Sequence, residues 1–119
     1  MFSHFGIFRE GGKMQEGLRK IQLLKERCRH VSLANRDPAV NQALVRYLEL
    51  EGMVQLAEVV ARGAIGREES RGSHTRRDYP GRDDRRFLAH TVANMEKDVI
   101  TIGYKPVTLG MFKVEERGY

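Results

Sequence analysis

The sequence predicts a mainly α-helical fold: a three-helix bundle, spectrin-repeat-like, followed by an extended arginine-rich segment and a small C-terminal β-hairpin. Three observations carry this prediction. Two long stretches before residue 66 repeat apolar residues at spacings of three and four, residues 67–86 are almost free of apolar residues, and two β-branched, aromatic runs follow. We expect residues 1–66, 67–86 and 87–119 to pack as one domain, because 119 residues are one domain's worth of chain.

The composition is typical of a soluble globular domain, with 40% hydrophobic and 31% charged residues. The longest uncharged apolar run is far below the ~20 residues that span a bilayer, so a transmembrane helix is not expected. No charged and then apolar leader opens the chain, so no secretory signal is predicted. Cys28 is the only cysteine, and the absence of an internal disulfide fits a reducing compartment.

The charge pattern favours ion pairing over nucleic-acid binding. The chain has 15 Arg and 6 Lys with a formal net charge of +5, and residues 67–86 hold seven Arg and five acids. Because these acids alternate with the arginines, the segment predicts a network of ion pairs and not a stripe that follows phosphates. No nucleic-acid partner is expected.

The first element is a short helical or 3₁₀ piece over residues 2–9. Phe2, Phe5 and Phe8 recur every three residues, which predicts one buried aromatic face. An exposed patch of three Phe needs a partner surface, so the isolated chain is expected to self-associate through this Phe-rich N-terminus. Gly11 and Gly12 then interrupt the chain.

The second element is an amphipathic helix over residues 13–31. Its predicted apolar stripe consists of Met14, Gly17, Ile21, Leu24, Cys28 and Val31. Since Cys28 lies on this stripe, we interpret it as a small buried apolar residue and not as a reactive thiol.

The third element is a long helix over residues 38–65. Residues 35–38 are a helix-start signal, in which Asp37 accepts hydrogen bonds from the first turn and Pro38 takes the first helical position. Its apolar positions include Ala43, Tyr47, Leu50, Val54, Ala57, Ala61 and Ala64, broadened by Leu44, Leu48, Leu56 and Val60. A stripe this long exceeds what a helix of under twenty residues covers, so a further surface is expected to approach it.

Residues 67–86 predict an extended polar segment, which in a domain this size is usually functional or disordered. The runs 86–92 and 98–104 predict a β-hairpin with its turn at residues 94–97. The tail, residues 107–119, has room for one more short strand.

The most informative stretch, residues 67–84, reads R-E-E-S-R-G-S-H-T-R-R-D-Y-P-G-R-D-D. It resembles the signature R-x-E-S-R-G-x-H-x-R-x-D-[FY]-P-x-R-D-D in the C-terminal region of succinate dehydrogenase and fumarate reductase flavoprotein subunits; L-aspartate oxidase has a related version. The resemblance covers about residues 4–92. The residues that we single out from it are Arg67, Glu69, Ser70, Arg71, Gly72, His74, Arg76, Asp78, Pro80, Asp83 and Asp84.

These residue types can hold an extended segment in place through ion pairs and turn caps. Asp78, Asp83 and Asp84 can cap turns or accept the guanidinium groups of Arg71 and Arg76, and Gly72 permits a sharp turn. Two interpretations stay open: a network that pins the extended segment to its own bundle, or direct chemistry. We favour the first. The resemblance indicates the same, since in the family the motif mainly attaches the helical domain to the flavin-binding body.

Features of a catalytic site are missing from this sequence. A flavin-binding G-x-G-x-x-G does not occur, and no strand is expected to lead into Gly11 and Gly12. The family's His-Thr-Gly-Gly element and its catalytic Arg and His residues lie upstream of the matching region. The four His residues lack metal-ligand spacing, and one Cys cannot hold an iron–sulfur cluster. We therefore assign no catalytic, cofactor-binding or metal-binding residue, and we expect Ser70 and His74 to be structural.

The resemblance implies a parent flavoprotein that interconverts succinate and fumarate with FAD and exchanges electrons with an iron–sulfur subunit. It implies a cytoplasmic complex, peripheral to the cytoplasmic or matrix face of a membrane, with the membrane anchor only an indirect partner. The chain would be a structural, interface-forming piece of that longer protein and inactive alone. The alternatives are the C-terminal domain of L-aspartate oxidase and a free-standing helical interaction module.

Overall fold

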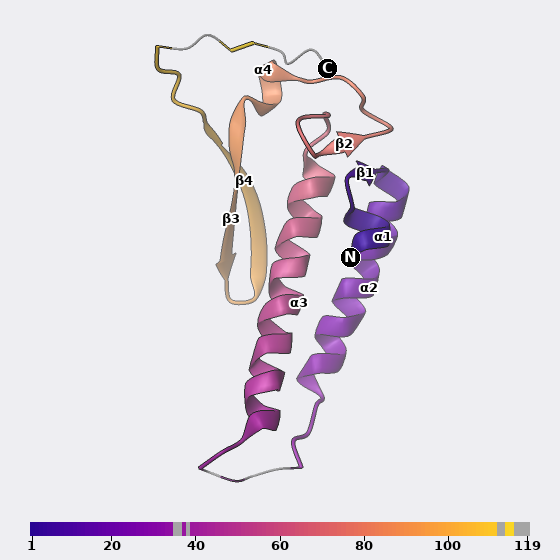
Figure 1. The fold of residues 1–119 in the computed structure, drawn as a ribbon, viewed down its shortest axis with the longest axis vertical. Coiled ribbons are helices and arrows are strands. Elements are labelled where there is room, and N and C mark those ends of the chain that lie inside the picture. Colours follow the sequence, from indigo (N-terminus) through magenta and orange to yellow (C-terminus); the bar gives the residue numbers. More distant parts are fainter. Residues whose placement is uncertain (35–36, 38, 112–113, 116–119) are drawn as a thin grey trace.

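The computed structural model describes residues 1–34, 37, 39–111 and 114–115. A long antiparallel helical hairpin carries a small cap of irregular chain at one end and a β-hairpin along its side (Figure 1). The elements in order are α1 (Phe2–Phe5), β1 (Phe8–Arg9), α2 (Gly11–Arg29), α3 (Gln42–Gly66), β2 (Thr75–Arg76), α4 (Asp84–Phe87), β3 (Ala89–Glu96) and β4 (Val99–Pro106). The radius of gyration is 18.2 Å, whereas a compact domain of this length has about 13.5 Å. The elongated shape leaves much of the helical hairpin uncovered.

Helix α2 forms where the apolar repeat predicts it, two residues earlier at each end. Met14, Ile21 and Cys28 are buried against α3, which confirms Cys28 as a packed residue. Leu24 and Val31, predicted on the same stripe, are each 47% exposed. Leu24 borders an open hollow between α2 and α3, and Val31 lies beyond the end of α2 at Arg29.

Helix α3 begins later than predicted, after Asn41, whose side-chain oxygen accepts from the Leu44 amide at 2.9 Å. The predicted start at Asp37 is wrong: its carboxylate accepts from the amide of Ala39 in a turn that precedes the helix. Residues 35, 36 and 38 of that signal lie outside the described residues. Val54, Ala61 and Ala64 are buried, whereas Leu44, Leu48, Leu56 and Val60 are exposed.

The predicted three-helix bundle is wrong in one respect, because the first helix is a single turn. Helix α1 buries only Phe5, while Phe2 and Phe8 are 92% and 69% exposed. After Gly6 the chain becomes extended, and β1 pairs in parallel with β2 through Phe8–Thr75 and Arg9–Arg76. The sequence pattern missed this pairing, since a two-residue strand has too few residues to show a period. The helical part is therefore a two-helix hairpin with a one-turn helix beside it.

Gly17 is what lets α1 lie against α2. A Cβ atom at Gly17 would lie 2.6 Å from Cε2 of Phe5 and 2.7 Å from Cβ of His4. Gly17→Ala should therefore push α1 away and destabilise the chain by about 1 kcal/mol, since the loss of Phe5 burial exceeds the gain in helix propensity. The matched change Gly12→Ala meets no atom within 4 Å and should be neutral or slightly stabilising. Equal effects in chemical unfolding would contradict this role of Gly17.

The C-terminal β-hairpin matches the prediction with shifted ends. Strands β3 and β4 pair from Ala89–Pro106 to Glu96–Val99. The turn is Lys97–Asp98, both with positive φ (47° and 66°), as in the two-residue turns that match the twist of a hairpin. One face packs on α3 and buries Ile100. Residues 107–111 and 114–115 contain no strand, and the rest of the predicted tail strand lies outside the described residues.

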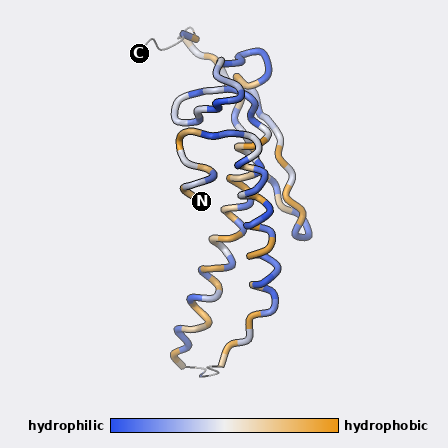
Figure 2. The backbone as a smooth tube through the Cα atoms, turned by 90° about the vertical axis from the view of Figure 1, so that its right-hand side faces the viewer, coloured by the Kyte–Doolittle hydropathy of each residue, from blue (hydrophilic) through white to orange (hydrophobic). Residues whose placement is uncertain are grey.

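The core is a thin layer between α1, α2 and α3, in which Met14 and Ala61 are fully buried. Hydrophobic residues nevertheless recur along the whole length of the helical hairpin (Figure 2). None of the described helices has the length and hydropathy needed to cross a bilayer.

Candidate functional site

The motif segment closes the end of the helical hairpin where α2 begins and α3 ends (Figure 1). Its charged side chains form two groups of ion pairs, which are joined where Arg76 donates to the backbone carbonyl of Arg67, and we call the whole set the arginine network. The network consists of Arg67, Glu69, Arg71, Arg76, Asp78, Arg82 and Asp84.

Glu69 is the buried centre of the network, with no exposed surface. Its carboxylate accepts from Nη1 of Arg67 at 2.5 Å, from Nε and Nη2 of Arg71 at 2.8 and 3.0 Å, and from the Asp83 amide at 2.9 Å. Burial by itself raises the pKa of Glu69, but the hydrogen bonds from Arg71 and Asp83 hold that pKa below its usual value. Glu69 is therefore a buried anion that the arginines keep charged.

Arg71 extends the network to the loop before α4. Its Nη2 also donates to Asp84 at 2.6 Å, and Arg82 holds the same carboxylate at 2.6 and 2.8 Å. Hydrogen bonds from Arg82 and then Arg71 hold the pKa of Asp84 far below its usual range, and the bond to Glu69 raises the pKa of Arg71. The predicted pairing of Arg71 with a motif aspartate is confirmed.

Arg76 and Asp78 join two helix ends. Nη1 of Arg76 donates to the carbonyls of Ala64 and Ile65 in the last turn of α3 and to that of the C-cap residue Arg67, at 3.2–3.3 Å. Asp78 accepts from Nε and Nη2 of Arg76 at 2.7 Å each and from the amide of Gly11 at 3.0 Å. A helix C-terminus favours a cation and a helix N-terminus an anion, and α3 has no basic residue in its last turn and α2 no acidic one in its first. The Arg76–Asp78 pair supplies both.

The short polar residues of the motif shape the loop. Oγ of Ser70 accepts from the amide of Arg76 and donates to the carbonyl of Tyr79, both at 2.8 Å. Gly72 has a φ of 57°, which favours glycine, and makes the turn that brings Arg71 opposite His74. Asp83 caps α4 through the amides of Arg85 and Arg86, and Pro80 lies exposed in the loop before it.

His74 is half-buried between two arginines. Its Nδ1 accepts from Nη1 of Arg9 at 2.5 Å, and its Nε2 lies 2.9 Å from the carbonyl oxygen of Arg67. This assigns the neutral tautomer with the proton on Nε2, since an arginine only donates and a carbonyl only accepts. Burial first, and then the charges of Arg9, Arg76 and Arg67, lower the pKa of His74.

This lowered pKa predicts a loss of stability in mild acid. Between the unfolded pKa of about 6.5 and the lower folded value, the unfolded chain binds a proton at His74 that the folded chain does not. The stabilisation is therefore present above about pH 6.5 and is lost as the pH falls. Urea unfolding between pH 7 and pH 5 should show that the free energy of unfolding falls more steeply with decreasing pH for the wild type than for His74→Gln. The variant keeps the carboxylates, so their titration affects both proteins equally. Parallel losses would contradict the prediction.

Arg67 connects the end of α3 to the β-hairpin. It donates to the carbonyls of Phe87 and Ala89, and its Nε lies 3.3 Å from Oγ1 of Thr91. Its guanidinium carbon lies 5.5 Å from the centre of the Phe87 ring. The network therefore fixes the place where β3 starts.

Two charged residues outside the motif, Glu58 and Arg9, also make polar contacts between distant parts of the chain. The sequence analysis predicted neither of them. Glu58 of α3 is 4% exposed and accepts from Nζ of Lys25 in α2 at 2.9 Å and from Arg62 at 2.7 and 2.9 Å. The sequence does contain a signal for Glu58: it lies four residues after Val54, on the apolar stripe, and four residues before Arg62, which predicts a buried acid paired with that arginine. Arg9 had no such signal, because its partner His74 is 65 positions away.

The network leaves little of its hydrogen-bonding capacity for a cofactor or metal. The Ser70 hydroxyl donates to a carbonyl and not to a base. No group of three His, Cys, Asp or Glu residues in the described ranges is arranged to hold a metal ion. Contrary to expectation, a strand, β1, leads into Gly11 and Gly12, but the carboxylate of Asp78 occupies the N-terminus of α2, where a dinucleotide-binding fold would place its pyrophosphate.

Comparisons with known proteins match this chain along its whole length. Residues 1–119 match the family model described as fumarate reductase flavoprotein C-term. The chain is 38% identical to the fumarate reductase flavoprotein subunit of Mycobacterium tuberculosis (strain H37Rv) over 115 residues, which are 96% of the chain and 20% of that protein. It is 38% identical over 109 residues to the succinate dehydrogenase flavoprotein subunit of Coxiella burnetii, over 92% of the chain and 18% of that protein.

Solved structures show the same similarity. The FrdA subunit of a variant E. coli quinol fumarate reductase superposes with a TM-score of 0.90 at 32% identity, covering 95% of this chain and 20% of that one. A quinol-fumarate reductase with menaquinol molecules gives a TM-score of 0.85 at 32% identity, covering 91% and 19%. The chain spans about one fifth of the length of the relatives it matches.

Proposed function

The chain belongs to the family of C-terminal regions of succinate dehydrogenase and fumarate reductase flavoprotein subunits, and from this premise we propose that it is the structural, interface-forming domain of such an oxidoreductase. The observation that carries the proposal is the arginine network itself. Its carboxylates are paired with arginines of the same chain. The network therefore stabilises the arrangement of α2, α3 and the β-hairpin relative to one another.

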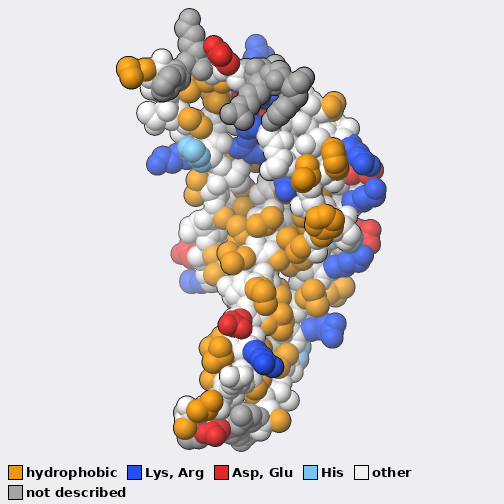
Figure 3. Space-filling view, viewed as in Figure 1, with side chains coloured by type: hydrophobic (Ala, Val, Ile, Leu, Met, Phe, Trp, Pro, Cys, Tyr) orange, Lys and Arg blue, Asp and Glu red, His pale blue; other side chains and the backbone are white. Residues whose placement is uncertain are grey.

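The exposed apolar surface of the helical hairpin supports an interface. Hydrophobic side chains gather along the middle of the elongated face (Figure 3). Exposed examples are Leu23, Leu24, Leu48, Leu50, Met53, Leu56 and Val60. Of these, Leu24, Leu50 and Met53 line one hollow beside α1, and exposed apolar surface on this scale marks a site of protein contact. We infer that the flavin-binding body of the parent subunit covers it, because the relatives have four fifths of their length outside the region that matches.

FAD is the cofactor of the parent in this proposal and does not fit this chain. The N-terminus of α2 is already occupied by Asp78, and the sequence has no G-x-G-x-x-G. The residues of this chain therefore hold the domain together, while binding of the flavin, oxidation of succinate or reduction of fumarate, and electron exchange with an iron–sulfur partner belong to the rest of the complex. We place that complex on the cytoplasmic or matrix face of a membrane.

A chimera tests this proposal. The chain would replace the matching fifth of the M. tuberculosis fumarate reductase flavoprotein subunit, and the chimera and a truncated subunit without that fifth would be purified. We expect the chimera to retain flavin absorbance and fumarate reduction and the truncated subunit to lose both. The isolated chain should be colourless and inactive with succinate and an artificial acceptor.

Two results would contradict the proposal. One is a truncated subunit that keeps its flavin and its activity, since the domain would then support nothing. The other is an isolated chain that binds FAD or oxidises succinate, since the chemistry would then lie within these residues.

A further inference from the structure

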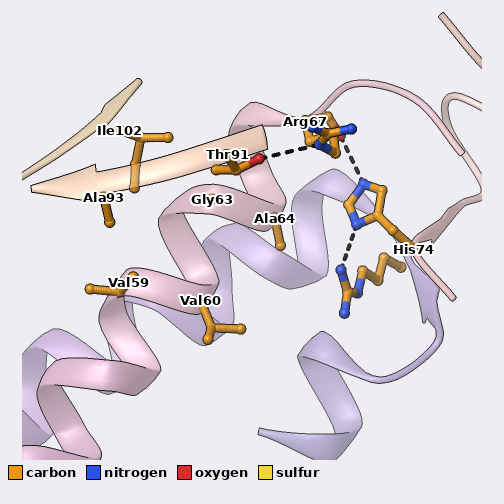
Figure 4. A pocket seen from close by; sticks show the side chains of 10 residues that line it. Val59, Val60, Gly63, Ala64, Arg67, His74, Thr91, Ala93 and Ile102 are labelled. Atoms are coloured by element: carbon orange, nitrogen blue, oxygen red, sulfur yellow. Dashed lines mark hydrogen bonds between the residues drawn. The ribbon is translucent and has the colours of Figure 1, made fainter. Parts of the chain in front are cut away.

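A hollow of about 310 Å³ lies between the C-terminal half of α3, the β-hairpin and the arginine network. Figure 4 shows His74 and Arg67 at one end of it and Val59, Val60, Ala93 and Ile102 at the other. Thr91 and Arg9 complete the polar end. The volume is at the lower end of the range of about 300–1,000 Å³ for small-molecule sites, and the proposed structural function does not use it.

Arg9, the cation at the polar end, has no counter-ion in the part of the chain that the structure describes. Among the described residues, no carboxylate lies within 4.0 Å of the Arg9 guanidinium, unlike Arg67 and Arg76. Within the described ranges, the acceptors of Arg9 are neutral: the carbonyls of Gly6 and Phe5 at 2.7 and 3.3 Å, and Nδ1 of His74. A guanidinium has five N–H donors, so two remain.

The surroundings do not supply the missing negative charge. Burial and the charge of Arg76 lower the pKa of Arg9, which is the response of a cation held near other cations. His74 is neutral, and the charge of Arg67 is balanced by Glu69. Oγ1 of Thr91 accepts from Nε of Arg67, which leaves the Thr91 O–H able to donate.

We propose that this hollow binds a carboxylate carried on a short aliphatic chain. The free N–H groups of Arg9 and the Thr91 O–H donate to the carboxylate oxygens, and Val60, Ala93 and Ile102 pack against the aliphatic part. A carboxylate matches the planar guanidinium fork better than other small anions do. The ligand is either a free aliphatic acid or a Glu or Asp side chain from the rest of the parent protein, since both present the same group.

Butyrate is the probe, and neutral butyramide of the same shape is its control. Both are titrated to about 50 mM, well above the millimolar affinity of a single weak site, while the amide and methyl NMR signals of the isolated chain are followed. We expect butyrate, and not butyramide, to shift Thr91, Ala93 and the Ile102 methyl signals in a saturable way. Arg9→Met should weaken binding at least about tenfold, whereas Arg9→Lys should retain part of it.

Arg77→Met is the matched control variant, because Arg77 lies at the same end of the molecule over the exposed Phe8 ring. It should leave the butyrate affinity unchanged. Equal responses to butyrate and butyramide would overturn the proposal. So would shifts that are spread over exposed arginines and that neither Arg9→Met nor Arg9→Lys alters; the butyramide comparison holds even if one variant fails to fold.

The full-length parent subunit separates the two sources of the carboxylate. If butyrate still shifts the Ile102 methyl signal there, the ligand is a free acid. If that signal already has its butyrate-bound position without butyrate, the parent's own side chain fills the hollow. An Ile102 signal that stays at the unbound position and does not respond would contradict the site in the parent.

Discussion

Glu69→Ala should destabilise the chain by about 3–5 kcal/mol, as expected for removal of one partner from a buried ion pair. The side chain has no exposed surface and receives hydrogen bonds from Arg67, Arg71 and the Asp83 amide. Without the carboxylate, these donors lose their acceptor, and the side chains of Arg67 and Arg71 are only 13% and 28% exposed. Because native domains are stable by only about 5–15 kcal/mol, the variant should unfold at a much lower denaturant concentration.

The neighbouring Glu68→Ala is the matched control for this change. Glu68 is partly exposed, with 37% of its side chain accessible, and its carboxylate pairs with the exposed Arg86 at 3.1 Å. Pairs of this kind contribute about 0–1 kcal/mol, so the control should have nearly the wild-type midpoint in guanidinium chloride. Similar midpoints for Glu69→Ala and the wild type would show that the arginine network does not hold the fold.

Glu58→Ala is the second change with a large expected effect, a loss of about 2–4 kcal/mol. It removes the buried anion that joins Lys25 of α2 to Arg62 of α3. Burial by itself raises the pKa of Glu58, but hydrogen bonds from Lys25 and Arg62 hold that pKa below its usual value. We expect less than for Glu69, because the side chains of Lys25 and Arg62 are 18% and 36% exposed and can regain water.

A second variant and a surface control complete this test. Glu58→Gln keeps the volume but not the charge, and should recover part of the loss measured by urea unfolding. Glu26→Ala removes an exposed carboxylate of α2 that pairs with Arg29 and His30, and should change stability by less than about 0.5 kcal/mol. If Glu58→Ala were as mild as Glu26→Ala, the pair between the helices would contribute nothing to their packing.

The acid side of the stability curve follows from the same groups. Hydrogen bonds from Arg76 lower the pKa of Asp78 to about 2, and those of Glu58 and Glu69 are also lowered. Carboxylates with lowered folded pKa values stabilise above their unfolded values of about 4 and lose this contribution as the pH falls. The chain should therefore unfold below pH 4, and the ion pairs of the arginine network should be lost in the same transition.

Local sequence patterns were sufficient for the helices and for the short-range pairs of the motif. The three–four repeat placed α2 and most of α3, because a buried stripe on a helix must recur at that period. The pairing of Arg76 with Asp78 was predictable, since two residues of spacing leave few other geometries. The length of the first helix was not predictable, because three Phe residues at a spacing of three fit both a long and a one-turn helix.

What the sequence alone determined is the presence of the two long helices and of the β-hairpin, and that the charges of residues 67–84 pair with each other. The tertiary structure decided which distant groups meet: Asp78 at the start of α2, Lys25 beside Glu58, and Arg9 beside His74. The physical reason is that periodicity and spacing fix the face of an element, whereas the partner of that face depends on the register in which the helices pack. A cation such as Arg9, which has no carboxylate partner among the residues that the structure describes, is recognised only from the packed structure.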